Sequence, residues 1–254
     1  MNDRIKDLLM KTPSTEVVIA EGWVKTKRDS KNVCFLELND GSCLKGLQIV
    51  IDKANLNNNS DVLTKINTGA SIVARGIIVK SEGGNQAVEM QSTDITILGE
   101  AGSDYPLQKK RHSIEYLREI GHLRARTNLI SAVMRVRNTL AYGVHEFFQK
   151  NDFVYVNTPL ISTSDCEGAG EMFQVTTLDL NNVPKTEEGN VDYSKDFFGK
   201  MANLTVSGQL EGETYAMALK NIYTFGPTFR AENSNTKRHL AEFWMIEPEM
   251  AFCD

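Results

Sequence analysis

A stretch near the end of the chain brings phosphate-binding side chains close to an aromatic ring. Residues 224–244 read TFGPTFRAENSNTKRHLAEFW, which predicts two strands joined by a polar turn. Arg230 ends the first strand, Glu232 follows two residues later, and Phe243 lies in the second strand. A guanidinium group binds phosphate or carboxylate through two parallel hydrogen bonds, a glutamate accepts a hydrogen bond from an amine or amide, and a phenylalanine ring offers a flat face to a purine.

The turn between these strands carries further positive charge. Lys237, Arg238 and His239 stand where they could reach a polyphosphate tail. The combination suits a nucleoside triphosphate bent over an antiparallel sheet. The sequence contains no G-x-x-x-x-G-K-[ST] phosphate loop and no G-x-G-x-x-G in a βαβ setting. Because an isolated Arg-x-Glu is most often a surface ion pair, the prediction depends on the conjunction of these residues.

The segments before this hairpin predict the elements that must position it. Residues 153–161 (FVYVNTPLI) predict a strand with Pro159 near its end, where the missing N–H is tolerated at an edge or interface. Residues 204–219 predict a strand, a turn and the start of a helix, and the polar residues 178–200 predict an insertion. Residues 124–150 predict an amphipathic helix whose apolar stripe consists of Leu129, Val133, Val136, Leu140, Val144 and Phe147.

The first hundred residues predict a small β-barrel. A helical candidate at residues 60–68 falls between the third and fourth of five β-branched-rich runs, which is the order of an OB-fold barrel. A generic small barrel is the alternative. The five runs are residues 17–26, 33–38, 46–51, 71–80 and 86–98.

Alternation within the second and third runs predicts which side chains face outward. If the apolar faces line the barrel, Phe35 and Gln48 point out of neighbouring strands. An exposed ring beside an exposed amide would form a stacking platform and a base reader. A phenylalanine packed under a loop is the alternative. The inward faces would consist of Cys34, Leu36 and Leu38 in one strand and Leu47, Ile49 and Ile51 in the other.

Composition excludes several classes of protein. The chain has 254 residues with a net charge of −5, and no apolar run is long enough to cross a membrane. The N-terminus shows no secretory signal. The four cysteines are scattered without a C-x-x-C pair, which argues against a zinc site or a disulfide framework and predicts a cytoplasmic protein.

One segment departs from the acidic balance of the chain. Residues 109–137 hold eight lysines and arginines against Glu115 and Glu119. Such a segment is either a solvated helix face with paired charges or a local surface for a polyanion. The sequence leaves both interpretations open.

The motifs together resemble a known family. FRAEN…RHLAEF resembles motif 2 of class II aminoacyl-tRNA synthetases, and FFQKNDFVYVNTPLI resembles their motif 1. GWVKTKRDSKNVCFLEL…GLQIVI resembles the N-terminal anticodon-binding domain of the aspartyl, asparaginyl and lysyl subgroup. GQLEGETYAMAL and the hairpin resemble the bacterial-type asparaginyl branch.

This resemblance implies an all-β OB-fold barrel followed by an α+β region, the antiparallel-sheet catalytic domain of class II synthetases in incomplete form. We therefore expect an anticodon-binding domain at residues 1–100, a linker or hinge at 101–123, and the N-terminal part of the catalytic domain at 124–254.

The resemblance implies a nucleotide site in the hairpin. Arg230 would bind the α-phosphate of ATP and the amino-acid carboxylate, acting as the catalytic residue. Glu232 would contact adenine or the adjoining part of ATP, and Phe243 would stack on the base. Arg238 and His239 would meet the β- and γ-phosphates.

It also implies an amino-acid pocket. Glu167 and Glu247 would hold the α-ammonium group, Ser207 and Gln209 would line the pocket, and Glu213 would read the side-chain amide. A pocket that carries a carboxylate, and lacks a positive charge beside the substrate side chain, favours asparagine and repels aspartate. The aspartyl enzymes usually carry a lysine where Gly212 stands, and the second candidate for the reader is Glu211.

On the barrel, the resemblance implies that Phe35 stacks on an anticodon base, Gln48 bonds to one, and Arg28 meets a nearby phosphate. The implied partners are tRNA(Asn), asparagine and ATP, with a homodimer formed through motif 1 and no membrane. Mg²⁺ would bridge the phosphates.

The sequence departs from the family after motif 2. Motif 3, with its glycine-rich strand and ATP-binding arginine, is absent, and the Mg²⁺ ligands are expected in the same missing part. The 254 residues are therefore expected to be an N-terminal part that is inactive alone. Three alternatives stay open: an aspartyl-tRNA synthetase, a non-catalytic RNA-binding module, and an enzyme of unknown substrate with an OB domain.

Overall fold

The computed structural model describes residues 3–57, 61–84, 86–164, 171–234, 236 and 238–253. The chain divides into two compact units, Met1–Arg137 and Asn138–Asp254. The division falls within one long helix, α4 (Asn128–Lys150). The domain boundaries expected from the sequence stay a prediction.

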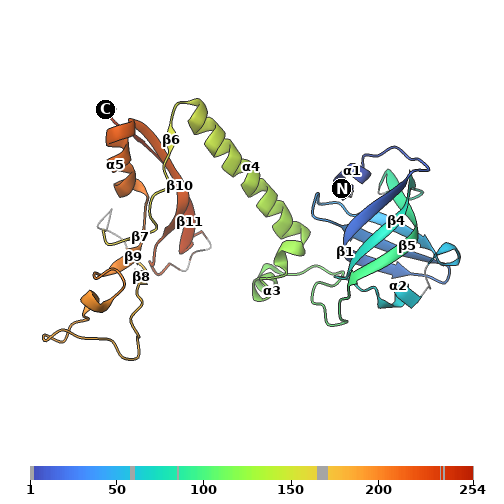
Figure 1. The fold of residues 1–254 in the computed structure, drawn as a ribbon, viewed down its shortest axis with the longest axis horizontal. Coiled ribbons are helices and arrows are strands. Elements are labelled where there is room, and N and C mark those ends of the chain that lie inside the picture. The colour runs from blue at the N-terminus through green and yellow to red at the C-terminus, as the bar shows by residue number, and fades with distance from the viewer. Residues whose placement is uncertain are drawn as a thin grey trace. The chain divides into compact units, whose positions relative to one another are not determined.

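The first unit contains a closed five-stranded barrel, drawn in blue to green in Figure 1. The strands close in the order β1-β2-β3-β5-β4, with α2 (Asp61–Lys65) between β3 and β4 in the sequence. This arrangement confirms the predicted OB-fold. A short helix α1 (Ile5–Leu8) precedes the barrel and a 3-10 turn η1 (Lys53–Asn55) follows β3. The strands are β1 (Val17–Asp29), β2 (Val33–Asn39), β3 (Leu47–Asp52), β4 (Ser71–Lys80) and β5 (Val88–Gly99).

Alternation along the strands fills the barrel as the sequence predicts. Full burial of each such side chain contributes about 1.5–3 kcal/mol, so these strands supply much of the stability of the barrel. At Gly76 a Cβ atom would lie only 2.0 Å from the Gln91 carbonyl oxygen, so β4 and β5 need a glycine there to approach. The buried side chains of β2 and β3, each exposed by 1% or less, are Cys34, Leu36, Leu38, Leu47, Ile49 and Ile51.

The connection after the barrel contains structure that the sequence analysis did not predict. A short helix, α3 (Ile114–Glu119), begins after Ser113, whose side-chain oxygen accepts a hydrogen bond from the Tyr116 N–H. Serine is a favoured residue at this capping position. Leu117 on α3 is buried, and a 3-10 turn, η2 (Arg124–Arg126), leads directly into α4.

The second unit is built around the predicted hairpin. β10 (Asn221–Phe229) pairs antiparallel with β11 (Glu242–Met250) and parallel with β6 (Val154–Tyr155). A separate small sheet has the order β7-β9-β8. Its strands are β7 (Ile161–Ser162), β9 (Ala202–Leu204) and β8 (Gln174–Val175).

The single strand predicted at residues 153–161 is wrong. The segment contributes two residues to one sheet through β6 and begins a strand of the other sheet with β7. Val156 still donates its N–H to the Tyr223 carbonyl, but Leu160 already accepts from the Thr205 N–H. Pro159 lies between these bonds, where its missing N–H costs nothing to either ladder.

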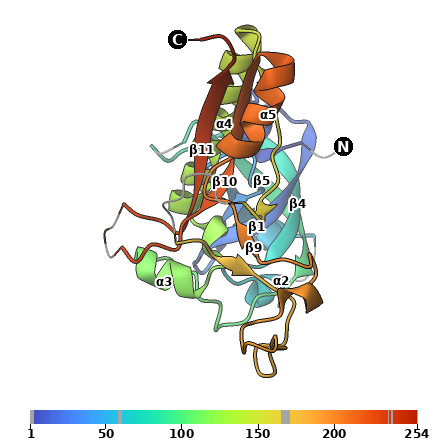
Figure 2. The same cartoon turned by 90° about the vertical axis from the view of Figure 1, so that its left-hand side faces the viewer.

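Helices cover the two faces of the β10–β11 hairpin. On one face, the C-terminal half of α4 places Phe148 on Tyr223 with ring centroids 4.6 Å apart, and His145 Nδ1 lies 2.7 Å from the Tyr223 hydroxyl oxygen. On the other face lies α5 (Gln209–Leu219), shown beside β10 and β11 in Figure 2. Opposite faces follow from alternation, because Gly212 of α5 packs toward Ile222, the neighbour of Tyr223.

The polar segment at residues 178–200 folds as a loop tied at Asp196. The Asp196 carboxylate accepts hydrogen bonds from Thr176 Oγ1, from the Thr177 N–H and Oγ1, and from the Phe197 N–H. These donors hold the pKa of Asp196 well below its ordinary range. A 3-10 turn, η3 (Tyr193–Lys195), immediately precedes this residue.

Candidate functional site

One face of the β10–β11 hairpin gathers most of the predicted site. The antiparallel register pairs Thr228 with Phe243, Thr224 with Glu247, and Ile222 with Glu249. Directly paired residues point to the same side of a sheet. Because Arg230 N donates to the Ala241 carbonyl at 3.0 Å, the pairing extends past the end of β10 and keeps Arg230 on this face. The structure therefore brings Arg230, Phe243 and Glu247 together along one surface.

Arg230 and Phe243 form the nucleotide end of this face. The guanidinium carbon of Arg230 lies 5.7 Å from the centre of the Phe243 ring. A cation at this distance is attracted to the face of the ring by about 0.5–1 kcal/mol in a partly exposed setting. Both side chains are half-buried. The contact restrains the guanidinium group before any phosphate arrives, which lowers the entropy cost of binding one.

Glu247 lies at the opposite end, where it accepts several hydrogen bonds from the protein. Its Oε2 accepts from Thr224 Oγ1 at 2.7 Å and from the Gly208 N–H at 3.1 Å. Its Oε1 accepts from the Ser207 hydroxyl and from the same Gly208 N–H at 3.2 Å. A carboxylate offers about four acceptor positions, and three donor groups use most of them here, because the one Gly208 N–H is shared between both oxygens. Glu247 therefore joins the start of α5 to both strands.

Ser207 does not line an open pocket in this structure. Its side chain is only 1% exposed, and its hydroxyl is used to donate to Glu247 and to accept from the Gln209 N–H at 3.0 Å. In this structure the hydroxyl supports Glu247, and the predicted place of Ser207 in the amino-acid pocket stays a prediction. The physical reason is that the residue lies in the turn before α5, where its side chain closes back on the backbone.

The two candidate carboxylates of α5 have different surroundings. Glu213 is exposed, and its Oε1 accepts from Gln209 Nε2 at 3.2 Å. Glu211 instead accepts from Ser162 Oγ at 3.0 Å, which ties it to β7. Gly212 between them is buried, and an added Cβ would contact Ile222 at 3.4 Å. A longer side chain would have to run along the hairpin face, so glycine leaves that surface open.

Glu249 completes a group of three carboxylates that the sequence analysis missed. Burial, and then the like charges of Glu213 and Glu247, raise the pKa of Glu249 above its ordinary value. The geometry agrees, since a Cβ atom on Gly212, the neighbour of Glu213, would lie 3.9 Å from Glu249 Cγ. The signal in the sequence was the spacing Glu247-x-Glu249 on a strand, because residues two apart share a face.

Three of the predicted site residues lie in the segment between β10 and β11. Glu232, Arg238 and His239 are exposed, and His239 Nδ1 contacts the Thr236 hydroxyl. Their predicted contacts with ATP stay a prediction. Glu167, predicted to hold the α-ammonium group, lies outside the described residues, as does Lys237.

The outer face of the barrel carries the second predicted site. Phe35 and Gln48 point outward from β2 and β3, as the alternation predicts, and both are half-buried rather than fully exposed. Arg28 of β1 pairs directly with Phe35, and its guanidinium carbon lies 4.3 Å from the centre of the ring. One face of the ring is thus covered by a cation. These three residues line a groove of about 980 Å³.

Glu89 of β5 orients Gln48, and the sequence analysis missed it. Its Oε2 accepts from Gln48 Nε2 at 3.0 Å and from Ser81 Oγ at 2.8 Å, and the residue is 7% exposed. Because the Gln48 amide donates to Glu89, its carbonyl oxygen is left as the acceptor that faces the groove. The pairing joins residues that are 41 positions apart, which periodicity cannot reveal.

Two protein-family models match the chain. Residues 113–254 match the family described as tRNA synthetases class II (D, K and N). Residues 17–98 match the OB-fold nucleic acid binding domain. The second match covers the barrel, and the first covers the hairpin site and α4.

Individual relatives agree with these matches. The asparagine–tRNA ligase of Picosynechococcus sp. is 58% identical over 99% of this chain, and that of Acetivibrio thermocellus is 62% identical over 94%. This chain covers 55% and 51% of those proteins, so it spans about half the length of the relatives it matches. The asparaginyl-tRNA synthetase from Pyrococcus horikoshii, solved with asparaginyl-adenylate, superposes with a TM-score of 0.82 at 26% identity.

That superposition covers 100% of this chain and 54% of the Pyrococcus protein. The Entamoeba histolytica asparaginyl-tRNA synthetase, at a TM-score of 0.77 and 23% identity, shares the fold. The order of barrel and hairpin, the matched families and the identities agree, and the chain belongs to the class II tRNA synthetases of the aspartate, lysine and asparagine group.

Proposed function

We propose that the protein containing this chain is an asparaginyl-tRNA synthetase, which activates asparagine with ATP and transfers it to tRNA(Asn). The observation that carries the proposal is the hairpin face, with the Arg230–Phe243 pair at one end and three carboxylates at the other. Arginine and an aromatic ring suit a nucleotide, while clustered carboxylates suit an ammonium group and a neutral amide. The similarity to asparagine–tRNA ligases supports the same substrate.

The first reaction step needs orientation and charge neutralisation more than covalent chemistry from the protein. A carboxylate oxygen of asparagine attacks the α-phosphorus of ATP, the bond from that phosphorus to the bridging oxygen breaks, and pyrophosphate leaves. Arg230 would neutralise charge on the α-phosphate and align the attacking carboxylate. Phe243 would stack on adenine, and Glu232, Arg238 and His239 would contact other parts of ATP.

In the second step a hydroxyl of the 3′-terminal ribose of tRNA attacks the aminoacyl carbonyl carbon, and AMP leaves. Gln209 and Glu213 would bind the asparagine side chain. We assign Glu247 to the α-ammonium group through its remaining acceptor position, with Thr224 and Gly208 holding it in place. Glu167 would bind the same group.

Magnesium is the usual partner of ATP in this family, and it would neutralise phosphate charge when bound. Among the described residues no group of three or more His, Cys, Asp or Glu side chains is placed to hold a metal ion. We therefore assign none of these residues as a Mg²⁺ ligand.

In the part of the chain that the structure covers, no helix is both long and apolar enough for a membrane span. The scattered cysteines support a cytoplasmic location.

We infer that the barrel reads the anticodon through Phe35 and Gln48, with Arg28 meeting a phosphate. Phe35→Ala is expected to weaken binding of the cognate tRNA by about 1–3 kcal/mol, because one stacking surface is lost. Folding should change little, since the neighbouring Leu36 and Cys34 form the core. Filter binding measures the affinity, and Leu98→Ala, also exposed on the barrel, is the matched control. Unchanged tRNA affinity in Phe35→Ala would exclude the stacking role.

We further propose that α4 forms a two-fold dimer interface. Its stripe is largely solvent-exposed, with Leu140 64% and Phe147 61% accessible. Dimers with self-complementary surfaces are the commonest assembly of soluble proteins. Leu140→Glu should convert a dimer to a monomer at micromolar concentration, because it buries two charges near the symmetry axis. Sedimentation velocity checks this, with Arg137→Glu beside the stripe as the control. A wild-type monomer would contradict the proposal.

The experiment that tests the function is asparagine-dependent ATP–pyrophosphate exchange by the full-length protein, followed by charging of tRNA(Asn). Exchange that requires asparagine, and not aspartate or lysine, supports the proposal. Exchange driven equally by aspartate would favour an aspartyl enzyme instead. Binding of RNA with no exchange by any amino acid would favour a non-catalytic module.

A further inference from the structure

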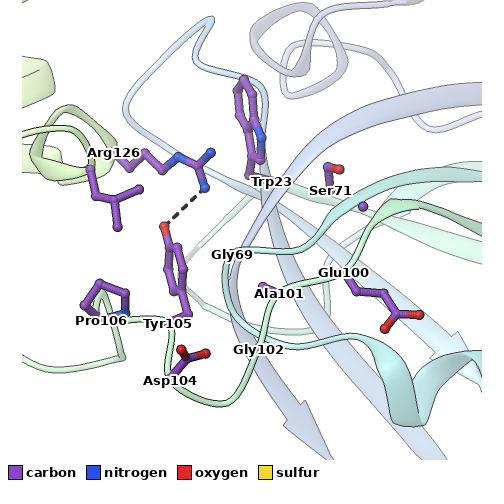
Figure 3. Close-up of a pocket in the computed structure, with 12 residues that line it drawn as sticks. Trp23, Gly69, Ser71, Glu100, Ala101, Gly102, Asp104, Tyr105, Pro106 and Arg126 are labelled. Atoms are coloured by element: carbon purple, nitrogen blue, oxygen red, sulfur yellow. Dashed lines mark hydrogen bonds between the residues drawn. The ribbon is translucent and has the colours of Figure 1, made fainter.

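Arg126, at the end of η2, joins two aromatic side chains from other segments of the first unit. Its guanidinium carbon lies 5.4 Å from the centre of the Trp23 ring on β1 and 5.9 Å from that of Tyr105 in the connection after the barrel. Its Nη1 also donates to the Tyr105 hydroxyl at 3.2 Å, the dashed line in Figure 3. The three residues line a groove of about 440 Å³. Arg126 is one of the eight basic residues between 109 and 137 whose role the sequence left open.

The Tyr105 ring is seated on a glycine of the barrel. Gly69 precedes β4 with a φ of +94°, a conformation that residues with a side chain rarely adopt. A Cβ atom at Gly69 would lie 2.8–2.9 Å from three atoms of the Tyr105 ring. Position 69 therefore needs glycine for two independent reasons, the positive φ and the close contact with the Tyr105 ring. Asn67 Nδ2 donates to the Ala101 carbonyl at 3.1 Å and ties the same turn to the connection.

Two further cations attach the first turns of α4 to the barrel. Lys25 Nζ on β1 donates to Oδ1 of Asn128, the first residue of α4, at 2.5 Å. Arg135, two turns further along the helix, donates to the Gly41 carbonyl in the loop after β2. Because its ammonium group is partly removed from water at this contact, burial lowers the pKa of Lys25.

We propose that Trp23, Gly69, Tyr105 and Arg126 form a latch that holds the connection after the barrel, and with it the first turns of α4, against the barrel within the first unit. The proposal rests on the proposed function, because its purpose is to present a tRNA held by the barrel at a defined place. Two linked binding sites gain affinity only when the linker holds them at a spacing that the ligand can span. Residues 100–127 have little regular structure, so the latch supplies that constraint. Arg126 and Tyr105 are positioning residues, since they act through the geometry of the connection.

The competing explanation is that Arg126 contacts a tRNA phosphate directly. The two explanations predict different tRNA binding for substitutions that leave the charge of the protein unchanged. Gly69→Ala displaces Tyr105 and Tyr105→Ala removes its ring, but neither removes a positive charge. Arg124→Ala removes an exposed charge from the same η2 turn without touching the latch, and it is the matched control for Arg126→Ala.

The test uses the full-length protein and three measurements: the KM for tRNA in charging, the rate of ATP–pyrophosphate exchange, and the Kd for an isolated anticodon stem-loop RNA. Gly69→Ala, Tyr105→Ala and Arg126→Ala should each raise the tRNA KM on the order of ten- to a hundredfold. The rate of ATP–pyrophosphate exchange and the Kd for the stem-loop RNA should stay at wild-type values. Tyr105→Phe, which loses only the hydroxyl, should show a smaller rise in the tRNA KM. Arg124→Ala should stay near wild type.

The latch is overturned if Gly69→Ala and Tyr105→Ala leave the tRNA KM unchanged. It is also overturned if only Arg126→Ala weakens binding and the salt dependence of tRNA affinity falls with it, because that is the mark of a phosphate contact. An equal loss of stem-loop affinity would place the damage in the barrel and refute the latch. Amide hydrogen exchange gives a test that needs no activity: residues 100–110 should exchange faster in Gly69→Ala. If the wild-type protein neither exchanges pyrophosphate nor charges tRNA, the proposed function fails. The rate of amide hydrogen exchange at residues 100–110 still decides whether the latch exists.

Discussion

Arg230→Ala is expected to lower the rate of asparagine-dependent ATP–pyrophosphate exchange in the full-length protein by about 10²–10³-fold, the usual cost of removing a charge stabiliser from a preorganised site. The structure supports a large effect because the guanidinium group is already held over Phe243 at 5.7 Å. The fall should appear mainly in kcat, since the charge that Arg230 neutralises grows as the α-phosphorus is attacked. Pre-steady-state measurement of adenylate formation would separate this step from product release.

Arg230→Lys separates charge from geometry. Lysine keeps the positive charge but loses the planar fork and the stacking surface, so most of the activity should still be lost. Arg118→Ala removes an exposed arginine from α3 and should leave exchange unchanged. If Arg230→Lys retains wild-type exchange, charge alone suffices and the role of the Phe243 contact is disproved. If Arg230→Ala also retains it, the nucleotide site lies elsewhere.

The fold could be predicted from the sequence wherever a short period repeats. Residues 34–38 and 47–51 alternate cleanly, and their strands and inward faces are as predicted. The hairpin was also predictable, because two apolar runs flank one polar turn, although the sequence left its register open. The strand around Pro159 was not, since its residues divide between two sheets according to partners far along the chain.

The candidate site was predictable as residue types and less so as contacts. Arg230 and Phe243 were identified from their positions in the hairpin and Glu247 from the family resemblance, and the register places all three on one face. Two of the donors that hold Glu247 come from residues 23 and 40 positions away, and no local pattern encodes such bonds. The same limit applies to Glu89 and to the Tyr105 seat on Gly69, because both depend on the closure of the barrel.

Glu213→Gln is expected to reduce the preference for asparagine over aspartate by about 10²-fold or more. A site that recognises an amide through a carboxylate gains its discrimination from a group that an aspartate side chain cannot satisfy and is repelled by. Glu213 shares this region with Glu247 and Glu249, so an incoming carboxylate would meet several negative charges. The measurement is kcat/KM for exchange with each amino acid. The KM for asparagine should rise in the same variant.

The proximity of Glu213 to Glu249 can be tested apart from activity. A like charge nearby disfavours the ionised form of Glu249, so removing the charge of Glu213 should lower the Glu249 pKa toward its ordinary value. Carboxyl carbon shifts followed through a pH titration would show the change.

Glu211→Gln is the matched control for Glu213→Gln, because the two residues lie two positions apart on α5 and Glu211 is bonded to Ser162 at 3.0 Å. Glu211→Gln should keep the preference for asparagine over aspartate, since the wild-type Glu211 carboxylate already has a partner on β7. The contrary result, unchanged preference in Glu213→Gln with collapse in Glu211→Gln, would move the amide reader by two residues. It would also mean that the β7 end of the pocket, and not the three-carboxylate end, recognises the side chain of the substrate.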